Sequence, residues 1–343
     1  MRVGFDISQV AHQGGVVSYT QNLVRRLVNI KDLEMVFFYS SLRKVYKGDL
    51  PNVKSFPLPP TIFEPLFNSL RIIPIESFIG QIDVFHSSDW TQPRAKAKKV
   101  TTYHDVVPLK YPQWSHPKIA AVAKRRLEIV EKEVDCVIAV SESTKRDLLE
   151  LTNIPKERIT VIYEAAADYF KPQEENEING FKKEFNLPKE FVLAIGGVGE
   201  RRNLKRVKEA AKKYNLVITG ETIPYVTEKQ MPLLYASAKV LLYPSLYEGF
   251  GLPILEAMAT GTPVITSNVS SMPEVGGKAA EYVNPESVID IENKLRQVME
   301  DEKRREKMIK LGFEQAKKFS WEKCAKETVE VYRNLMGKPK VST

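Results

Sequence analysis

Two glutamates, Glu248 and Glu256, stand at the ends of the segment with the clearest capacity for chemistry. A carboxylate accepts hydrogen bonds from neighbouring hydroxyl groups, so sugars and riboses are natural partners for either side chain. Pro253 suits the first turn of a helix and Gly261 its C-terminal cap, and the amides of residues 250–252 would then point out of a helix N-terminus towards a phosphate. A capped amphipathic helix with two ordinary surface acids explains this pattern equally well.

A pair of arginines, Arg201 and Arg202, follows a predicted strand over 191–195 and a glycine-bearing turn. Two guanidinium groups supply forked N–H donors that match the oxygens of a pyrophosphate. A dinucleotide-binding turn of the dehydrogenase type, with Glu221 on the ribose, is the alternative. Arg202 argues against it, because that position needs a third glycine for close helix packing.

Two adjacent glycines, Gly14 and Gly15, follow the first predicted strand. They would let the backbone approach a ligand closely, and a helix predicted from Ser18 would direct its N-terminus at that ligand. Taken alone, the pair is better explained as a tight strand–helix turn.

His104 ends a predicted strand over 100–103, and Asp105 beside it could orient the imidazole ring. A histidine in such a place is most often structural or merely exposed. His86 also ends a strand, and we interpret it in that ordinary way.

Strands alternate with helices along the whole chain, which is typical of parallel α/β layers. A polar stretch, residues 171–184, separates two such series and is the best candidate boundary, with a surface helix as the alternative. We therefore expect two doubly wound, Rossmann-like domains, residues 1–170 and 171–320, facing each other across a ligand cleft. A C-terminal helix at about 321–337 could return to the first domain.

The composition fits two globular domains and argues against a small secreted protein, an integral membrane protein, a collagen and a coiled coil. The 343 residues carry a net charge of +8, which suits phosphorylated substrates, an anionic membrane face or nucleic acid without selecting one. Two cysteines are too few for a disulfide framework, and the sequence shows neither a signal peptide nor a membrane-spanning segment, so we expect a cytoplasmic protein. Because no aromatic–basic interleaving stands out, nucleic acid is not an expected partner.

The segment Glu248-Gly-Phe-Gly-Leu-Pro-Ile-Leu-Glu256 resembles the signature of the retaining glycosyltransferases of family 4, in the GT-B group. The resemblance covers nearly the whole chain, continuing at residues 102–105, 138–144, 257–264, 270–275 and 319–321. It is strongest to bacterial mannosyltransferase-like members that build envelope polysaccharides. It implies the GT-B architecture and transfer of a hexose, with mannose the expected one, from a GDP- or UDP-linked sugar. The anomeric configuration would be retained, and no metal or other cofactor would be required.

The resemblance also assigns residues to the donor sugar and nucleoside. Glu248 matches the family's glutamate beside the donor sugar, and Glu256 matches the one that holds the ribose hydroxyls. The turn Phe250-Gly251-Leu252 would contact sugar and phosphates through its backbone. His104 matches a histidine near the donor sugar, so the predicted catalytic residues are His104 and Glu248.

Other positions match the family's phosphate and base contacts. Gly14 and Gly15 match the first-domain loop that faces the donor diphosphate, and Val226 stands where the base often packs. Arg201 and Arg202 stand where the family commonly has Arg-Lys. The positive charge is kept at the second position, but the reach of the side chain differs.

The expected acceptor is a glycan or a lipid-linked glycan in polysaccharide or lipopolysaccharide synthesis, held mostly by the first domain. The apolar segment 55–80 and a basic amphipathic helix could together place the enzyme on the anionic inner face of the cell membrane. That helix carries Lys118, Lys124, Arg125 and Arg126. A packed layer beside a solvated basic face explains the same residues.

Alternative functions remain open at this stage. A sugar-nucleotide epimerase would share the fold, and so would a phosphorylase, although no motif marks the pyridoxal-phosphate lysine that a phosphorylase needs. A non-catalytic scaffold that binds sugar nucleotides is the alternative from outside enzymology.

Overall fold

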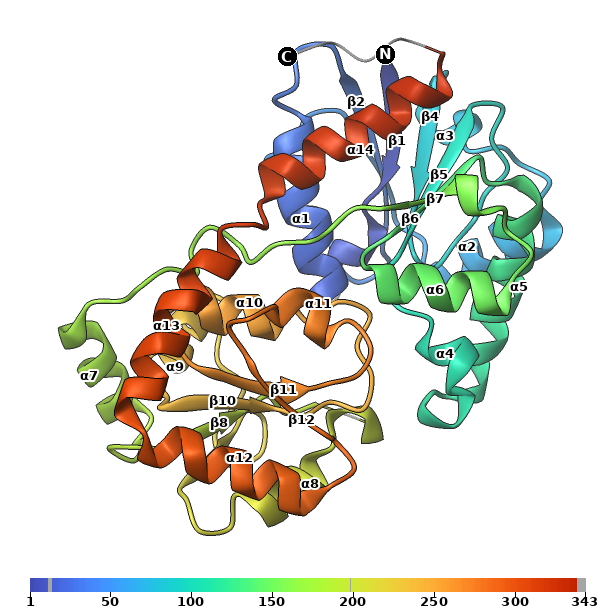
Figure 1. Ribbon diagram of the computed structural model, residues 1–343. Coiled ribbons are helices and arrows are strands. Elements are labelled where there is room, and N and C mark those ends of the chain that lie inside the picture. The colour runs from blue at the N-terminus through green and yellow to red at the C-terminus, as the bar shows by residue number, and fades with distance from the viewer. Residues whose placement is uncertain (12–13, 198, 338–343) are drawn as a thin grey trace. The chain divides into compact units, whose positions relative to one another are not determined.

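The computed structural model describes residues 1–11, 14–197 and 199–337. The chain divides into two compact units, one formed by Met1–Glu164 together with the segment from Trp321, the other by Ala165–Ser320. Each unit is built on one parallel sheet (Figure 1). The predicted fold class, α/β with two doubly wound sheets, is confirmed. No helix in the described part of the chain is both long and apolar enough to span a membrane.

The first unit has a seven-stranded sheet in the order β3-β2-β1-β4-β5-β6-β7. Its strands are β1 (Arg2–Asp6), β2 (Glu34–Ser40), β3 (Val53–Phe56), β4 (Val84–Ser87), β5 (Lys98–Tyr103), β6 (Cys136–Ala139) and β7 (Ile159–Val161). Its helices are α1 (Gly15–Leu27), α2 (Pro60–Glu64), α3 (Glu76–Ile79), α4 (Val107–Lys110), α5 (Pro117–Glu133), α6 (Glu142–Leu151) and α14 (Trp321–Leu335). The short apolar runs form strands because a parallel sheet is buried on both faces.

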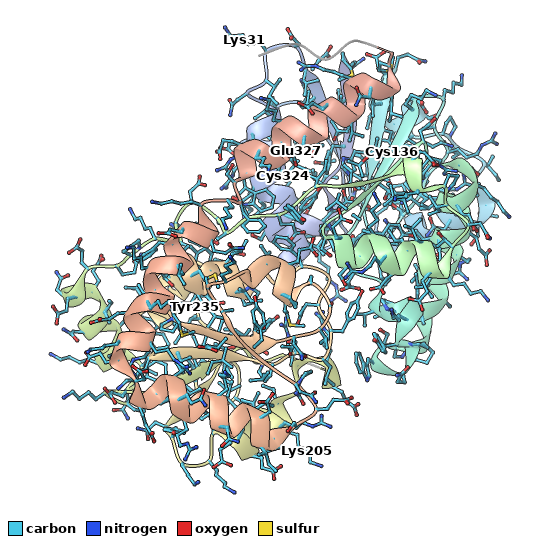
Figure 2. The ribbon with its side chains drawn as sticks, in the orientation of Figure 1. Lys31, Cys136, Lys205, Tyr235, Cys324 and Glu327 are labelled. Carbon is cyan, nitrogen blue, oxygen red and sulfur yellow. The ribbon has the colours of Figure 1, made fainter. Side chains whose placement is uncertain are left out.

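The C-terminal helix α14 packs against α1 within this first unit (Figure 1). Trp321 and Tyr332 of α14 are almost completely buried there, so the helix is part of the core of the unit. Both cysteines, Cys136 on β6 and Cys324 on α14, are buried and free (Figure 2).

Residues 55–80 form a packed layer that the sequence analysis did not divide into elements. The end of β3, α2, a π-helical turn at Pro65–Leu70 and α3 place Phe56, Phe63, Phe67 and Phe78 around Phe38 of β2. Part of the segment stays outside this core, because Leu70 and Ile72 are 62% and 69% exposed.

One predicted member of the basic helix surface is misplaced. Helix α5 leaves Lys118, Lys124 and Arg125 exposed, but Arg126 is only 4% exposed. Val122 and Val130, one helical turn on either side of Arg126, are also buried, so Arg126 lies on the inward face of α5. It therefore cannot belong to an exposed basic surface.

The second unit has a five-stranded sheet in the order β12-β11-β10-β8-β9. Its strands are β8 (Val192–Ala194), β9 (Leu216–Ile218), β10 (Val240–Tyr243), β11 (Val264–Ser267) and β12 (Glu281–Val283). Its helices are α7 (Glu175–Glu184), α8 (Leu204–Ala210), α9 (Met231–Ser237), α10 (Leu252–Ala259), α11 (Met272–Gly276), α12 (Val288–Glu300) and α13 (Glu302–Ala316). The polar stretch 171–184, predicted as a domain boundary with a surface helix as the alternative, contains helix α7.

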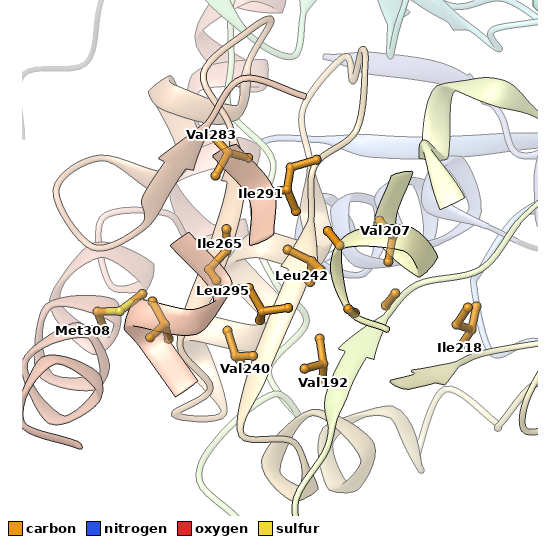
Figure 3. Packing of buried hydrophobic residues seen from close by; sticks show 14 residues of the cluster. Val192, Val207, Ile218, Val240, Leu242, Ile265, Val283, Ile291, Leu295 and Met308 are labelled. Atoms are coloured by element: carbon orange, nitrogen blue, oxygen red, sulfur yellow. The ribbon is translucent and has the colours of Figure 1, made fainter. Parts of the chain in front are cut away.

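The core of the second unit lies between the sheet and the pair α8 and α12, while α10 and α11 cover the other face and α9 and α13 pack against α10 (Figure 1). Figure 3 shows Val240, Leu242 and Ile265 of the strands packing towards Ile291 and Leu295 of α12. These side chains are almost completely buried. The rigid sheet fixes where the loops at its carboxyl edge begin and end.

Candidate functional site

The sheet order of the second unit brings two loops together. Strands β8 and β10 are neighbours and parallel, and β9 and β11 lie on their outer sides. A switch point of this kind opens a crevice at the carboxyl ends of the strands, where open α/β sheets bind ligands. The loop after β8 carries Arg201 and Arg202 on a 3-10 turn, and the loop after β10 carries Glu248.

Glu248 is held by three side chains at the carboxyl edge of the second sheet. Arg202 Nη1 donates to Glu248 Oε1 at 2.8 Å, and Arg201 Nη1 donates to Oε2 at 3.2 Å. The Tyr243 hydroxyl donates to Oε1 at 2.7 Å and also contacts Arg202. Burial opposes the charge on Arg202, but Tyr243 and Glu248 outweigh burial and raise the pKa of Arg202 above its ordinary value. Two guanidinium groups share one carboxylate, so the cluster keeps one excess positive charge.

The turn after Glu248 leads directly into α10, as the sequence predicted. Gly251 has φ 101° at the N-cap, a left-handed conformation that favours glycine, and Pro253 lies in the first turn. Gly261 follows the end of the helix with φ 83°. The Ser271 hydroxyl donates to the carbonyls of Glu248 and Phe250, which fixes the turn. The N-terminus of α10, with its first backbone amides, therefore lies directly after the turn that carries Glu248.

Glu256, one turn inside α10, accepts a hydrogen bond from Tyr235 of α9 at 2.8 Å; Figure 2 labels Tyr235. Burial raises the pKa of Glu256 to about 7, although the bond from Tyr235 acts in the opposite direction. Its carboxyl group therefore changes protonation state near neutral pH. Val226, the predicted base contact, is half-buried in the loop after β9.

His104 belongs to the first unit, where it directly follows β5. Its Nδ1 lies 2.8 Å from Oε1 of Glu164, whose side chain is nearly buried, and the imidazole and the Tyr19 ring pack in a T-shaped arrangement. Burial lowers the pKa of His104, but the hydrogen bond and charge of Glu164 outweigh it, and the net shift is upwards. Asp105, predicted to orient the ring, accepts the Val107 amide at 3.0 Å.

Glu164 is a residue that the sequence analysis missed. It follows β7, and β5, β6 and β7 are consecutive neighbours whose carboxyl ends share one edge. A carboxylate shortly after that strand was the available signal. His86, by contrast, is fully buried between the Tyr332 and Thr102 hydroxyls, at 2.6 and 2.9 Å.

Gly14 and Gly15 lie at the start of α1. Gly14 has φ 115°, and a Cβ built there would meet no atom of the described residues within 4 Å, which leaves room there for close approach to the backbone. The neighbouring positions 12 and 13 lie outside the described residues. The predicted site residues thus form two groups: Gly14, Gly15 and His104 in the first unit, and Arg201, Arg202, 248–256 and Val226 in the second. Their roles towards a donor stay predictions.

Comparisons with known proteins identify the family. The family model described as "Glycosyltransferase Family 4" matches residues 13–166, and "Glycosyl transferases group 1" matches residues 156–315. The O-antigen chain mannosyltransferase B of Escherichia coli is 30% identical over 290 residues, which cover 74% of each chain. The chain belongs to this family of glycosyltransferases. It is therefore an enzyme of the glycosyl-transfer class, as predicted.

Other similarities agree with this assignment. The serotype-specific mannosyltransferase WbdA of Escherichia coli is 28% identical over 283 residues, 71% of this chain but 34% of that protein, so the enzyme spans about a third of WbdA. The structure of sucrose-phosphate synthase from Thermosynechococcus elongatus has a TM-score of 0.78 at 18% identity, covering 98% of this chain and 99% of that one. Anabaena HepE, in complex with UDP-glucose, has a TM-score of 0.73 at 14% identity, covering 97% and 100%. These structures support the GT-B fold.

Proposed function

We propose that the enzyme transfers a hexose, with mannose the first candidate, from a nucleotide-diphosphate sugar to a glycan or lipid-linked acceptor, with retention of anomeric configuration. The observation that carries this proposal is the cluster of Arg201, Arg202 and Glu248 beside the N-terminus of α10. It combines groups for a diphosphate with a carboxylate for sugar hydroxyls at the switch point of the second sheet.

The diphosphate is the leaving group, and its negative charge grows as the bond to the sugar breaks. The excess positive charge of the arginine pair and the first amides of α10 would stabilise that charge without a metal ion. Among the described residues, no group of three or more His, Cys, Asp or Glu side chains could hold a metal ion.

Retention would follow from attack on the same face of the sugar. The bond between the anomeric carbon and the diphosphate oxygen breaks, and its electron pair leaves with the diphosphate. The acceptor oxygen bonds to the anomeric carbon, and its proton passes to the departing diphosphate oxygen. Glu248, released from the arginines when they bind phosphate, would accept hydrogen bonds from the donor sugar hydroxyls. His104, held by Glu164, would donate a hydrogen bond to the same sugar.

Mannose and polysaccharide synthesis are supported by the relatives. The E. coli proteins are named as an O-antigen chain mannosyltransferase and a serotype-specific mannosyltransferase. HepE was crystallised with UDP-glucose. We therefore rank GDP-mannose first as the donor and UDP-linked hexoses second.

The test is a panel of nucleotide sugars followed by product analysis. A true donor at a hundredfold excess over its Kd stabilises the folded enzyme by about 2.7 kcal/mol, so it will stand out in thermal denaturation. The product formed with a mannan fragment should have the anomeric configuration of the donor by NMR. An inverted product contradicts retention. A changed sugar nucleotide without acceptor indicates an epimerase, and binding without turnover indicates a scaffold.

We propose that the enzyme meets its acceptor at the surface of an anionic membrane. Exposed apolar side chains of 55–80, including Leu70 and Ile72, and the exposed Lys118, Lys124 and Arg125 support it. Each basic residue near such a surface contributes about 1 kcal/mol, screened by salt. Liposome flotation should therefore need anionic lipid and fall with salt. Equal flotation with neutral lipid, or none at low salt, would favour a soluble acceptor.

A further inference from the structure

Tyr243, the last residue of β10, is a buried member of the cluster that Arg201, Arg202 and Glu248 form. It is 3% exposed. Its hydroxyl donates to Glu248 Oε1 at 2.7 Å and accepts a hydrogen bond from Nη1 of Arg202. The guanidinium carbon of Arg202 also lies 5.2 Å from the centre of the Tyr243 ring. With so little exposed area Tyr243 offers almost no contact surface to a ligand, so any role in the reaction acts through its two neighbours.

The fold alone does not require a hydroxyl group at position 243. Residues 240–242 precede it in a strand that is buried along its whole length. A phenylalanine would fill the same space without a polar atom, and a buried hydroxyl is tolerated only when it is hydrogen-bonded. The hydroxyl of Tyr243 bonds to Arg202 and Glu248, which both have predicted roles towards the donor. Its contacts therefore suggest a function in holding these two side chains.

The backbone of Glu248 is fixed separately from its side chain. The Ser271 hydroxyl donates to the Glu248 carbonyl at 2.9 Å, and the Ser270 hydroxyl bonds to both the amide and the carbonyl of Glu248. Ser270 has φ 58°, a left-handed conformation that is unfavourable for residues other than glycine. Such strain persists only where the surrounding contacts impose it. The loop after β11 thus defines where the Glu248 backbone lies, while Tyr243 and the arginines define where its carboxylate points.

A diphosphate would affect the partners of this carboxylate differently. Arg201 and Arg202 are cations, and in the proposed function they turn from Glu248 to the diphosphate. Burial raises the pKa of Tyr243 above its ordinary value of 10, while Arg202 opposes this rise and Glu248 adds to it. The Tyr243 hydroxyl therefore stays protonated and neutral. It can continue to donate to Glu248 while the arginines bind phosphate.

We propose that Tyr243 is a positioning residue for glycosyl transfer. Its hydroxyl keeps the Glu248 carboxylate directed at the donor sugar once the arginines have turned to the diphosphate. Glu248 touches the sugar, and Tyr243 acts only through Glu248. The inference rests on the proposed function, because that function supplies both the diphosphate and the sugar.

The kinetic test introduces Tyr243→Phe into the native enzyme and into Glu248→Ala. In the native enzyme kcat should fall about tenfold, while the Kd for GDP or UDP should change less than about threefold. The hydroxyl bonds to Glu248 and to Arg202 affect the freedom of Arg202 in opposite directions, so their loss nearly cancels in nucleotide binding. In Glu248→Ala the same substitution should leave kcat unchanged, because Tyr243 then has no carboxylate to position. An equal fall in both backgrounds would assign Tyr243 a purely structural role, and no fall in the native enzyme would also overturn the proposal.

Tyr282→Phe is the matched control for loss of a tyrosine hydroxyl. Tyr282 lies on β12 of the same unit, and its hydroxyl donates to the Gly277 carbonyl at 2.7 Å. Because this bond does not involve the arginines or Glu248, kcat and nucleotide affinity should stay unchanged. A fall in kcat as large as that of Tyr243→Phe would overturn a specific role for Tyr243.

A binding measurement is independent of transfer. Calorimetry without acceptor compares GDP with GDP-mannose and UDP with UDP-glucose, so the ratio of each pair of Kd values measures what the sugar adds to binding. Tyr243→Phe should weaken binding of the nucleotide sugar about threefold or more relative to the nucleoside diphosphate, and the double variant should lose no more than Glu248→Ala alone.

The outcomes separate the two proposals. If the native enzyme binds a nucleotide sugar but epimerises it or never turns it over, transfer fails, while this pattern of affinities still supports the role of Tyr243. An unchanged ratio in Tyr243→Phe overturns that role even where transfer is observed. Failure of the native enzyme to bind any nucleotide sugar would overturn both.

Discussion

Replacing Glu248 with glutamine separates binding from turnover. The substitution keeps the shape of the side chain but removes its charge, so the net charge of the cluster with Arg201 and Arg202 rises from one positive charge to two. The side chains of Arg201, Arg202 and Glu248 are 28%, 18% and 8% exposed, so their charges lie between water and protein interior. Two unit charges 4 Å apart interact with an energy of about 1 kcal/mol in water and about 4 kcal/mol near a protein surface.

The expected gain in diphosphate binding energy lies in the lower part of that range. A bound diphosphate is partly hydrated, and its charge lies farther from the position of Glu248 than a direct contact. A gain of about 1–2 kcal/mol corresponds to roughly 5- to 30-fold tighter binding of a nucleoside diphosphate. Turnover should change in the opposite direction. Loss of the carboxylate that receives the donor sugar should lower kcat by about 100-fold or more, the usual effect of removing one group that stabilises a transition state.

Calorimetric titration with GDP and UDP measures the binding, and initial rates with the donor measure turnover. Glu286→Gln is the matched control, because it removes the same charge from an exposed site in the same unit and should alter neither quantity. Unchanged or weaker nucleotide binding by Glu248→Gln would refute competition between Glu248 and the diphosphate for the arginines. Unchanged kcat would remove Glu248 from the donor sugar.

Three further predictions concern the same site. Arg202→Ala should weaken nucleoside diphosphate binding by about 1.5–3 kcal/mol, one charge-assisted contact, and calorimetry with no change would exclude Arg202 from it. The pKa of Glu256 is raised from 4.5 to about 7, so the stability that its neutral form contributes is complete below about pH 4.5 and is lost as pH rises through about 7. Glu256→Gln should therefore raise Tm relative to the native enzyme at about pH 8 but not at about pH 4, and an equal difference at both would contradict the shift. Dialysis against EDTA should leave transfer unchanged, and activity restored only by added Mg²⁺ or Mn²⁺ would show that the cationic groups of the chain are insufficient.

The sequence was most informative where local rules and the fold agree. Continuous apolar runs predicted β1, β6 and β10 because parallel strands are buried on both faces. Pro253 and Gly261 predicted both ends of α10, because each residue has a specific conformational role at a helix terminus. Arg201 and Arg202 contact Glu248 because β8 and β10 are neighbours in the sheet. No local sequence pattern predicts that neighbourhood.

Residues 55–80 were less predictable for a physical reason. Their prolines and short turns interrupt any helical or alternating period, so the apolar side chains carried no signal of which would be buried. The structure buries Phe63 and Phe67 and leaves Leu70 and Ile72 exposed. Glu164 was missed because its contact with His104 spans 60 positions in the sequence and depends on the order β5-β6-β7.

Arg126 was predicted on the wrong face of α5. It was predicted to lie on an exposed basic surface that could contact an anionic membrane, although its spacing of four residues from Val122 and Val130 puts it on the apolar stripe of α5. A guanidinium on such a stripe breaks the agreement between helical pattern and burial, and it has no carboxylate partner in the described chain to offset the cost of burial. The Thr101 hydroxyl and the Thr102 carbonyl accept hydrogen bonds from the guanidinium, and the ring of Tyr103 lies 4.1 Å from it. These contacts offset part of the cost of burial, so the position of Arg126 follows from the helical period and not from its charge.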